Sequence, residues 1–194
     1  MKWTLPNLLT LLRIVLIPVL VVVFYLPGES VPLVSAAIFG LAAVTDWLDG
    51  FLARRLRQQS IFGAFLDPVA DKLMVAVALV LLVEANRNVF FTIPVAVIIG
   101  REIAISALRE WMSEIGERAT VAVSIIGKIK TTAQMIAILL LLYAHPVGGF
   151  PTHQVGVVLL YVAAILTLWS MFIYLRAAWP VLVGNSGISG GPDA

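Results

Sequence analysis

The sequence predicts an all-α membrane protein with about six transmembrane helices and both termini in the cytoplasm. Of its 194 residues, 61% are hydrophobic and only 12% are charged, whereas about a quarter of the residues of an ordinary soluble domain are charged. The apolar residues fall into six segments of roughly the length that crosses a bilayer. Lysine and arginine gather at every second connection between these segments. Together these three observations define the fold class.

Each apolar segment is expected to form one helix. The segments are residues 8–26, 31–46, 64–83, 89–108, 125–144 and 155–175. The second keeps helical spacing beyond its apolar part, as far as Arg55, so this helix should project from the bilayer. Between Arg109 and Thr120 charged residues alternate with a few apolar ones, which indicates an elbow at the membrane surface.

The basic residues indicate the orientation of the chain. The connections 27–30, 84–88 and 145–154 contain one arginine between them, and the alternate connections carry the basic clusters. By the positive-inside rule, the basic connections and both termini lie in the cytoplasm. The first apolar run lacks a small-residue cleavage site after it, so it is expected to be a retained span. Residues 1–183 are expected to form a single domain, followed by a disordered tail over residues 184–194, which is rich in Gly and Ser.

Four aspartates indicate a metal site at the cytoplasmic surface. Asp46 and Asp49 are three residues apart, and Asp67 and Asp71 are four apart, so each pair lies on one face of its helix. Four carboxylates this close repel one another unless cations lie between them. Oxygen donors without His or Cys favour Mg²⁺ or Mn²⁺. Two such ions can hold the attacking and leaving oxygens of a phosphoryl transfer.

Small residues accompany these aspartates and leave room for a ligand to approach the backbone. Together with one arginine they form a pattern with fixed spacing: Asp46-x-x-Asp49-Gly50-x-x-Ala53-Arg54, eight residues, then Gly63-x-x-x-Asp67-x-x-x-Asp71. At every position this pattern resembles the signature of the CDP-alcohol phosphotransferases.

The resemblance implies a role for each motif residue. The first three aspartates would bind metal, and Asp71 would bind metal and also act as the catalytic base. The cytidine diphosphate would be bound by Asp49, Gly50, Ala53, Arg54 and Gly63.

Further segments resemble bacterial members of this family that use glycerol 3-phosphate as acceptor: residues 6–13, 45–55, 62–72, 101–111 and 127–134. This resemblance implies an enzyme that transfers the phosphatidyl group of CDP-diacylglycerol to the C1 hydroxyl of sn-glycerol 3-phosphate and releases CMP. It implies a place in the bacterial cytoplasmic (inner) membrane, with the active site facing the cytoplasm, among membrane lipids. It also implies a homodimer and no nucleic-acid partner. The alternative is a related enzyme with inositol phosphate, serine or phosphatidylglycerol as acceptor.

Four basic residues are candidates for binding the acceptor phosphate: Arg101, Arg109, Lys128 and Lys130. Arg101 lies deep in an apolar span, where an arginine needs an anionic partner or ligand. The alternative is that Arg101 forms a structural bridge with Glu102 or Glu110.

Two further alternatives concern other charged residues. Arg54, Arg55 and Arg57 could serve only as topology anchors. The chain could also be a cation transporter whose aspartates line an ion path. The aspartates crowd one surface and do not recur at several depths, which argues against transport.

Overall fold

The computed structural model describes residues 5–56, 61–115 and 125–182, and this part of the chain forms six helices. They are α1 (Leu5–Phe24), α2 (Val31–Leu56), α3 (Ile61–Asn86), α4 (Val89–Glu114), α5 (Ile125–Tyr143) and α6 (Thr152–Leu182). Each helix contains or largely overlaps one predicted apolar segment, so the prediction of an all-α chain with about six helices is confirmed. The predicted tail, residues 184–194, lies outside the described residues.

Within the described residues, four helices are long and apolar enough to cross a membrane: α1, α2, α4 and α6. Helix α3 carries Asp67, Asp71 and Lys72 in its first half and Glu84 near its end, so charges interrupt its apolar surface. Helix α5 has a shorter apolar stretch, Ile129–Tyr143. Charged residues are costly in lipid and are therefore rare there outside functional sites, which indicates that α3 carries functional groups.

Helices α2 and α4 extend further than the hydrophobic core of a bilayer. Each has 26 residues, or about 39 Å at 1.5 Å per residue, against a hydrocarbon thickness of about 30 Å. The continuation of α2 beyond its apolar part is therefore confirmed. The surface elbow expected between Arg109 and Thr120 is not found in its first part, since α4 continues without a break through Arg109 to Glu114. Residues 116–120 lie outside the described part.

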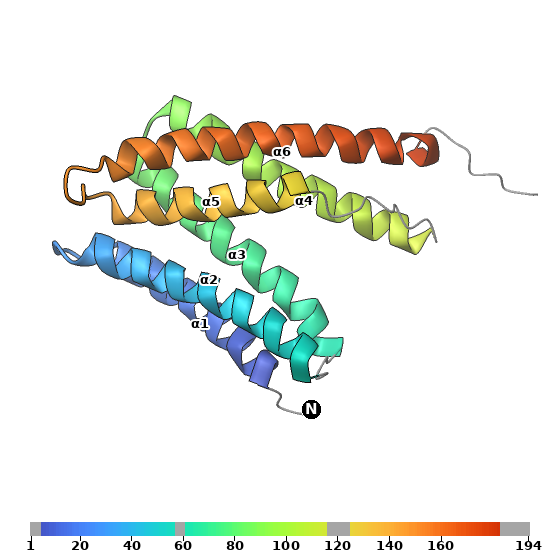
Figure 1. Cartoon of the computed structure of the whole chain (residues 1–194), viewed down its shortest axis with the longest axis horizontal. Helices are drawn as coiled ribbons and strands as arrows, with labels where there is room; N and C mark the ends of the chain where they lie inside the picture. Colours follow the sequence, from blue (N-terminus) through green and yellow to red (C-terminus); the bar gives the residue numbers. More distant parts are fainter. Residues whose placement is uncertain (1–4, 57–60, 116–124, 183–194) are drawn as a thin grey trace, which may run out of the picture.

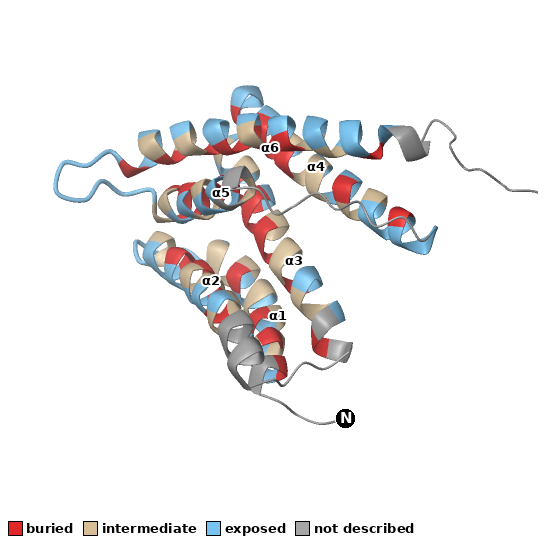
Figure 2. Ribbon diagram, turned by 45° about the vertical axis from the view of Figure 1, so that its right-hand side comes forward, coloured by how far each residue is buried: buried red, intermediate tan, exposed pale blue. Residues whose placement is uncertain are grey.

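The helices pack as two pairs that meet where α2 lies against α5, and α3 packs against both pairs (Figure 1). Helices α1 and α2 lie side by side, and α5 and α6 form a second pair, with α4 packed against α6. Helix α3 contacts helices of both pairs. Buried residues lie along the facing sides of the helices (Figure 2), and the core includes Phe39 of α2, Leu79 of α3 and Ile138 of α5.

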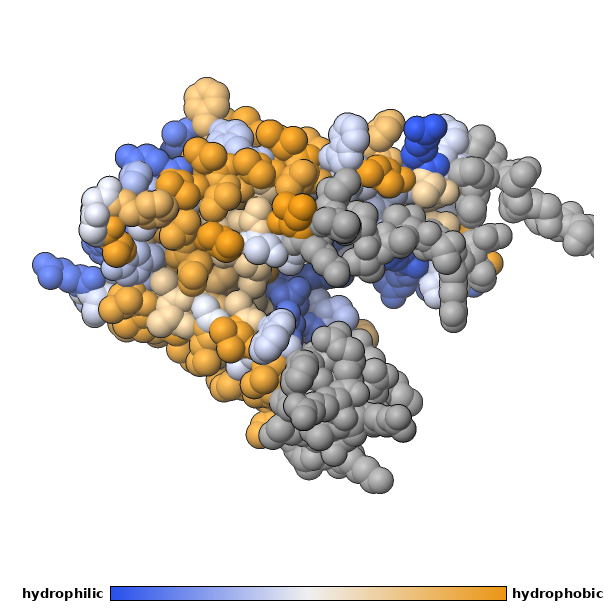
Figure 3. Space-filling model, viewed as in Figure 1, coloured by the Kyte–Doolittle hydropathy of each residue, from blue (hydrophilic) through white to orange (hydrophobic). Residues whose placement is uncertain are grey.

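Apolar side chains also cover much of the outer surface (Figure 3). Val80, Ile165 and Phe172 are each about three-fifths exposed, which suits contact with lipid better than contact with water. Hydrophilic side chains gather instead in a recess between α3 and α4 (Figure 3). The polar site of the molecule is therefore found where these helices diverge.

The close packing of α5 on α6 depends on Gly156. A Cβ atom at this position would lie 2.8 Å from Leu141 Cγ and 3.3 Å from Leu140 Cβ, and small residues allow helices in membranes to approach this closely. Gly156→Ala is expected to reduce the free energy of unfolding by about 1–3 kcal/mol, as overpacking does. Thermal unfolding in detergent should show a lower Tm.

Gly40→Ala is the matched control, because its new Cβ would meet Leu139 Cδ1 at an ordinary 3.5 Å. This variant should keep or slightly raise the Tm, since alanine favours helix more than glycine does. An unchanged Tm for Gly156→Ala would show that α5 and α6 can separate at little cost.

Candidate active site

Helix α1 holds two of the motif aspartates through side chains that lie on one of its faces. Arg13 Nη1 lies 2.9 Å from Asp46 Oδ1 of α2, and the Arg13 side chain is only 1% exposed. The hydroxyl of Thr10, three residues earlier, donates a hydrogen bond to Asp67 Oδ1 of α3. These contacts fix the orientation of the two carboxylates, in the way that residues hydrogen-bonded to metal ligands orient those ligands.

Sequence reasoning assigned no role to Thr10 or Arg13. The signal was present, because an arginine within the apolar run 8–26 requires a partner in the membrane. The identity of that partner could not be read from spacing, since Asp46 belongs to another helix.

Asp71 connects the carboxylate group with the space between α3 and α4. It lies one helical turn beyond Asp67 and therefore on the same face of α3. It lies close enough to Asp46 and Arg13 to interact with their charges, and it lines the same cavity as Lys72 and Glu102. Asp71 is thus the motif aspartate that belongs both to the carboxylate group and to the cavity.

Several predicted site residues have side chains outside the described part of the chain: Asp49, Gly50, Ala53 and Arg54 in α2, and Lys128 in α5. Their backbones continue the helices, so Asp49 follows Asp46 by about one turn. Gly63 is buried in the first turn of α3.

The donor chemistry of the described carboxylates suits a divalent metal. No group of three His, Cys, Asp or Glu side chains in a metal-binding arrangement occurs among the residues that the structure describes, a set that lacks the Asp49 side chain. Asp46, Asp67 and Asp71 offer oxygen atoms only, which hard cations such as Mg²⁺ and Mn²⁺ prefer. The contacts of Arg13 and Thr10 leave further lone pairs on Asp46 and Asp67 for a metal.

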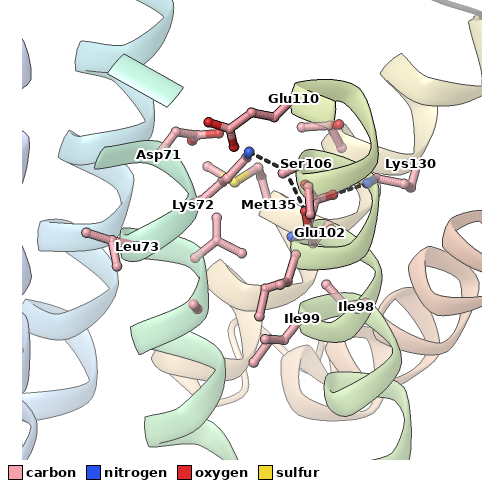
Figure 4. Close-up of a pocket in the computed structure, with 16 residues that line it drawn as sticks. Asp71, Lys72, Leu73, Ile98, Ile99, Glu102, Ser106, Glu110, Lys130 and Met135 are labelled. Atoms are coloured by element: carbon pink, nitrogen blue, oxygen red, sulfur yellow. Dashed lines mark hydrogen bonds and ion pairs between the residues drawn. The ribbon is translucent and has the colours of Figure 1, made fainter. Parts of the chain in front are cut away.

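A cavity of about 500 Å³ opens beside Asp71, between α3, α4 and α5 (Figure 4). One part of its wall is polar and the other is apolar. The polar part consists of Asp71, Lys72, Glu102, Ser106, Glu110, Lys130, Thr131 and Gln134. The apolar part includes Val75, Ile98, Ile99 and Met135. The cavity can therefore hold a charged group at its polar wall while its remaining surface excludes water.

Hydrogen bonds to α4 position two lysines on opposite walls of this cavity (Figure 4). The ammonium of Lys72 donates to the Ser106 hydroxyl, which donates to the Glu102 carbonyl oxygen at 2.6 Å. From α5, Lys130 Nζ lies 2.6 Å from Glu102 Oε1. The two ammonium groups are thus held where an anionic ligand in the cavity could meet them.

Arg101 turns away from the cavity towards α6. Its Nη1 donates to Glu102 Oε1 at 3.0 Å and its Nη2 donates to the Ser170 hydroxyl at 3.1 Å. The guanidinium carbon lies 5.7 Å from the centre of the Tyr174 ring, within the range of a cation–π contact. The structure thus forms the bridge between Arg101 and Glu102 that was the alternative to phosphate binding.

The four basic residues expected at the acceptor phosphate are therefore distributed unevenly. Lys130 lines the cavity, while Arg101 reaches it only through Glu102. Arg109 is exposed and is not among the residues that line the cavity. No role for Lys72, Ser106 or Gln134 was predicted from the sequence. All three are polar residues within apolar segments, which could have indicated a function.

Comparison with known proteins identifies the family of the chain. The model of the CDP-alcohol phosphatidyltransferase family matches residues 3–169. A protein of Salmonella choleraesuis (strain SC-B67) named CDP-diacylglycerol–glycerol-3-phosphate 3-phosphatidyltransferase is 58% identical over 178 residues, which cover 92% of this chain and 96% of that protein. Proteins of the same name from Pectobacterium atrosepticum and Sodalis glossinidius are each 59% identical over 180 residues, with the same coverage. The chain therefore belongs to the CDP-alcohol phosphatidyltransferase family.

Proposed function

We propose that this protein is a membrane enzyme that transfers the phosphatidyl group of CDP-diacylglycerol to the C1 hydroxyl of sn-glycerol 3-phosphate. The products are phosphatidylglycerol phosphate and CMP, in phospholipid biosynthesis. The observation that carries the proposal is the position of Asp71, which joins the motif carboxylates to a cavity containing Lys72 and Lys130. Relatives named for this reaction match nearly the whole chain.

The proposed setting is the bacterial cytoplasmic (inner) membrane, with all six helices crossing it and both termini in the cytoplasm. Support comes from the basic connections on one side and the exposed apolar faces of the helices. The active site then faces the cytoplasm, where a lipid-bound pyrophosphate and a water-soluble phosphate can meet. Resemblance to the family supports a homodimer.

The metal-binding groups are Asp46, Asp49, Asp67 and Asp71, which would hold two Mg²⁺ or Mn²⁺ ions. When bound, these ions neutralise the negative charge of the pyrophosphate and of the transition state. Around the cytidine diphosphate, Gly50, Ala53 and Gly63 leave space and Arg54 supplies a cation. Arg13 and Thr10 keep the carboxylates of Asp46 and Asp67 in place.

Asp71 carries the proton transfer. Its carboxylate accepts the proton of the C1 hydroxyl, and the oxygen attacks the phosphorus that carries the diacylglycerol. The bond between this phosphorus and the oxygen of CMP breaks, and CMP leaves with the bonding electrons. The acceptor phosphate is bound in the cavity by Lys130 and Lys72, with Lys128 as a further cation on the same helix as Lys130, and Arg101 holds Glu102 in its bridging position.

The activity can be tested with the purified full-length protein in detergent, supplied with CDP-diacylglycerol, labelled glycerol 3-phosphate and Mg²⁺ or Mn²⁺. We expect one CMP for each labelled phosphatidylglycerol phosphate, identified by mass. Chelation with EDTA should abolish turnover, and added Mg²⁺ or Mn²⁺ should restore it. Unlabelled inositol phosphate, serine or phosphatidylglycerol should not compete. A lipid product formed from one of these instead would assign the enzyme to the alternative acceptor.

A further inference from the structure

Gln134 is a polar residue in the cavity that the reaction described above leaves without a role. It lies on α5 one turn after Lys130, and both residues are only 5% exposed. Gln134 lines the cavity together with Asp71 and Lys130. Its buried Oε1 atom has no hydrogen-bond partner in the part of the chain that the structure describes.

The neighbouring walls of the cavity offer no polar side chain one helical turn beyond Asp71 or one turn before Glu102. Helices α3 and α5 run away from the carboxylate end and α4 runs towards it (Figure 1). One turn beyond Asp71 on α3 the lining residue is Val75, and one turn before Glu102 on α4 it is Ile98. At the level of Gln134 the other two walls of the cavity are therefore apolar. An unpaired buried polar group costs about 1–3 kcal/mol.

An amide suits a neutral hydroxyl better than a phosphate. Glutamine carries no charge, and its amide oxygen only accepts hydrogen bonds, whereas a phosphate needs cations and hydrogen-bond donors. A hydroxyl both donates and accepts, so it can bond to either end of the amide, whichever faces the cavity. The cavity therefore offers cations at Lys72 and Lys130, a carboxylate at Asp71, and at Gln134 a neutral group whose oxygen has no described partner.

Glycerol 3-phosphate presents a matching set of groups, and this step rests on the function proposed above. Its phosphate pairs with the lysines and its C1 hydroxyl with Asp71, which leaves the C2 hydroxyl between them. Gln134 follows Lys130 by one helical turn, a Cβ separation of about 5–6 Å, on the scale of a three-carbon phosphate. We propose that Gln134 binds the C2 hydroxyl of the acceptor and selects acceptors that have a hydroxyl next to the reacting carbon.

The test compares glycerol 3-phosphate with 3-hydroxypropyl phosphate, which has the same phosphate and reacting hydroxyl but lacks the C2 hydroxyl. Wild-type enzyme should prefer glycerol 3-phosphate by about tenfold in kcat/KM, the size expected for one hydrogen bond. Gln134→Met keeps the length of the side chain and removes the amide, so the preference should fall to nearly one. The variant should still use 3-hydroxypropyl phosphate.

Thr131→Val is the matched control on the same helix. Thr131 lines the cavity, but its hydroxyl already donates to the Gly127 carbonyl oxygen at 3.0 Å. This variant should keep the wild-type preference between the two acceptors.

The outcomes separate this inference from the proposed function. A wild-type enzyme that uses both acceptors equally well would overturn the role of Gln134, even if the variant failed to fold. An equal loss on both acceptors in Gln134→Met would assign the residue to packing and would also overturn it. Absence of transfer to either acceptor by wild-type enzyme would instead contradict the proposed function.

Discussion

Asp71→Asn is expected to lower kcat for phosphatidyl transfer by about 10²- to 10⁴-fold, the usual contribution of a general base. Asparagine has nearly the same shape but does not accept the proton of the attacking hydroxyl. Asp71 is placed for this role between the carboxylates held by α1 and the cavity that contains Lys72. The loss should persist when Mg²⁺ or Mn²⁺ is raised, because added metal can compensate for a weakened metal site but not for a missing base.

The measurement is CMP release from CDP-diacylglycerol in detergent at saturating glycerol 3-phosphate. Glu84→Gln is the control, since it removes one carboxylate from the other end of α3, where Glu84 accepts a hydrogen bond from Tyr25. This control should keep wild-type activity. Near-full activity of Asp71→Asn would refute the role of Asp71 as the base. Recovery of activity at high metal concentration would show that Asp71 only binds metal.

Glu102→Gln is expected to have the largest effect on stability, a loss of about 3–5 kcal/mol, as found when a buried ion pair loses one partner. Glu102 Oε1 lies 3.0 Å from Arg101 Nη1 and 2.6 Å from Lys130 Nζ. The side chains of the two cations are only 10% and 6% exposed. Without the carboxylate, two positive charges would remain close together between α4, α5 and α6.

A double variant tests this explanation. Glu102→Gln/Lys130→Met removes one of the two uncompensated cations, so it should regain part of the Tm that Glu102→Gln loses in thermal unfolding. It should not regain transferase activity, because Lys130 lines the cavity proposed to bind the acceptor. Glu110→Gln is the control, since Glu110 lines the same cavity but is exposed and should change stability little. Equal Tm values for the single and double variants would contradict the charge explanation.

The positions of the helices followed from the sequence because they depend on local properties, although α4 and α6 end 6 and 7 residues beyond the predicted segments. A run of apolar residues of span length forms a helix in lipid, where each backbone group must be bonded within the segment. The extension of α2 beyond its apolar part was predicted as far as Arg55 from the helical spacing of its residues, and the helix ends at Leu56. The elbow expected after Arg109 was wrong for residues 110–114, which continue α4, because charged residues mark the membrane surface but do not show whether a helix ends there.

Part of the candidate site could also be predicted from the sequence, and part could not. The spacing of Asp46, Asp49, Asp67 and Asp71 determined by itself which carboxylates share a helix face, and with the small residues it indicated the reaction class. Spacing within one helix does not show which neighbouring helix that face meets. Only the tertiary structure joined Arg13 to Asp46, turned Arg101 towards Ser170 and left Gln134 lining the cavity. These contacts depend on how six helices pack, and residue patterns within single segments do not contain that information.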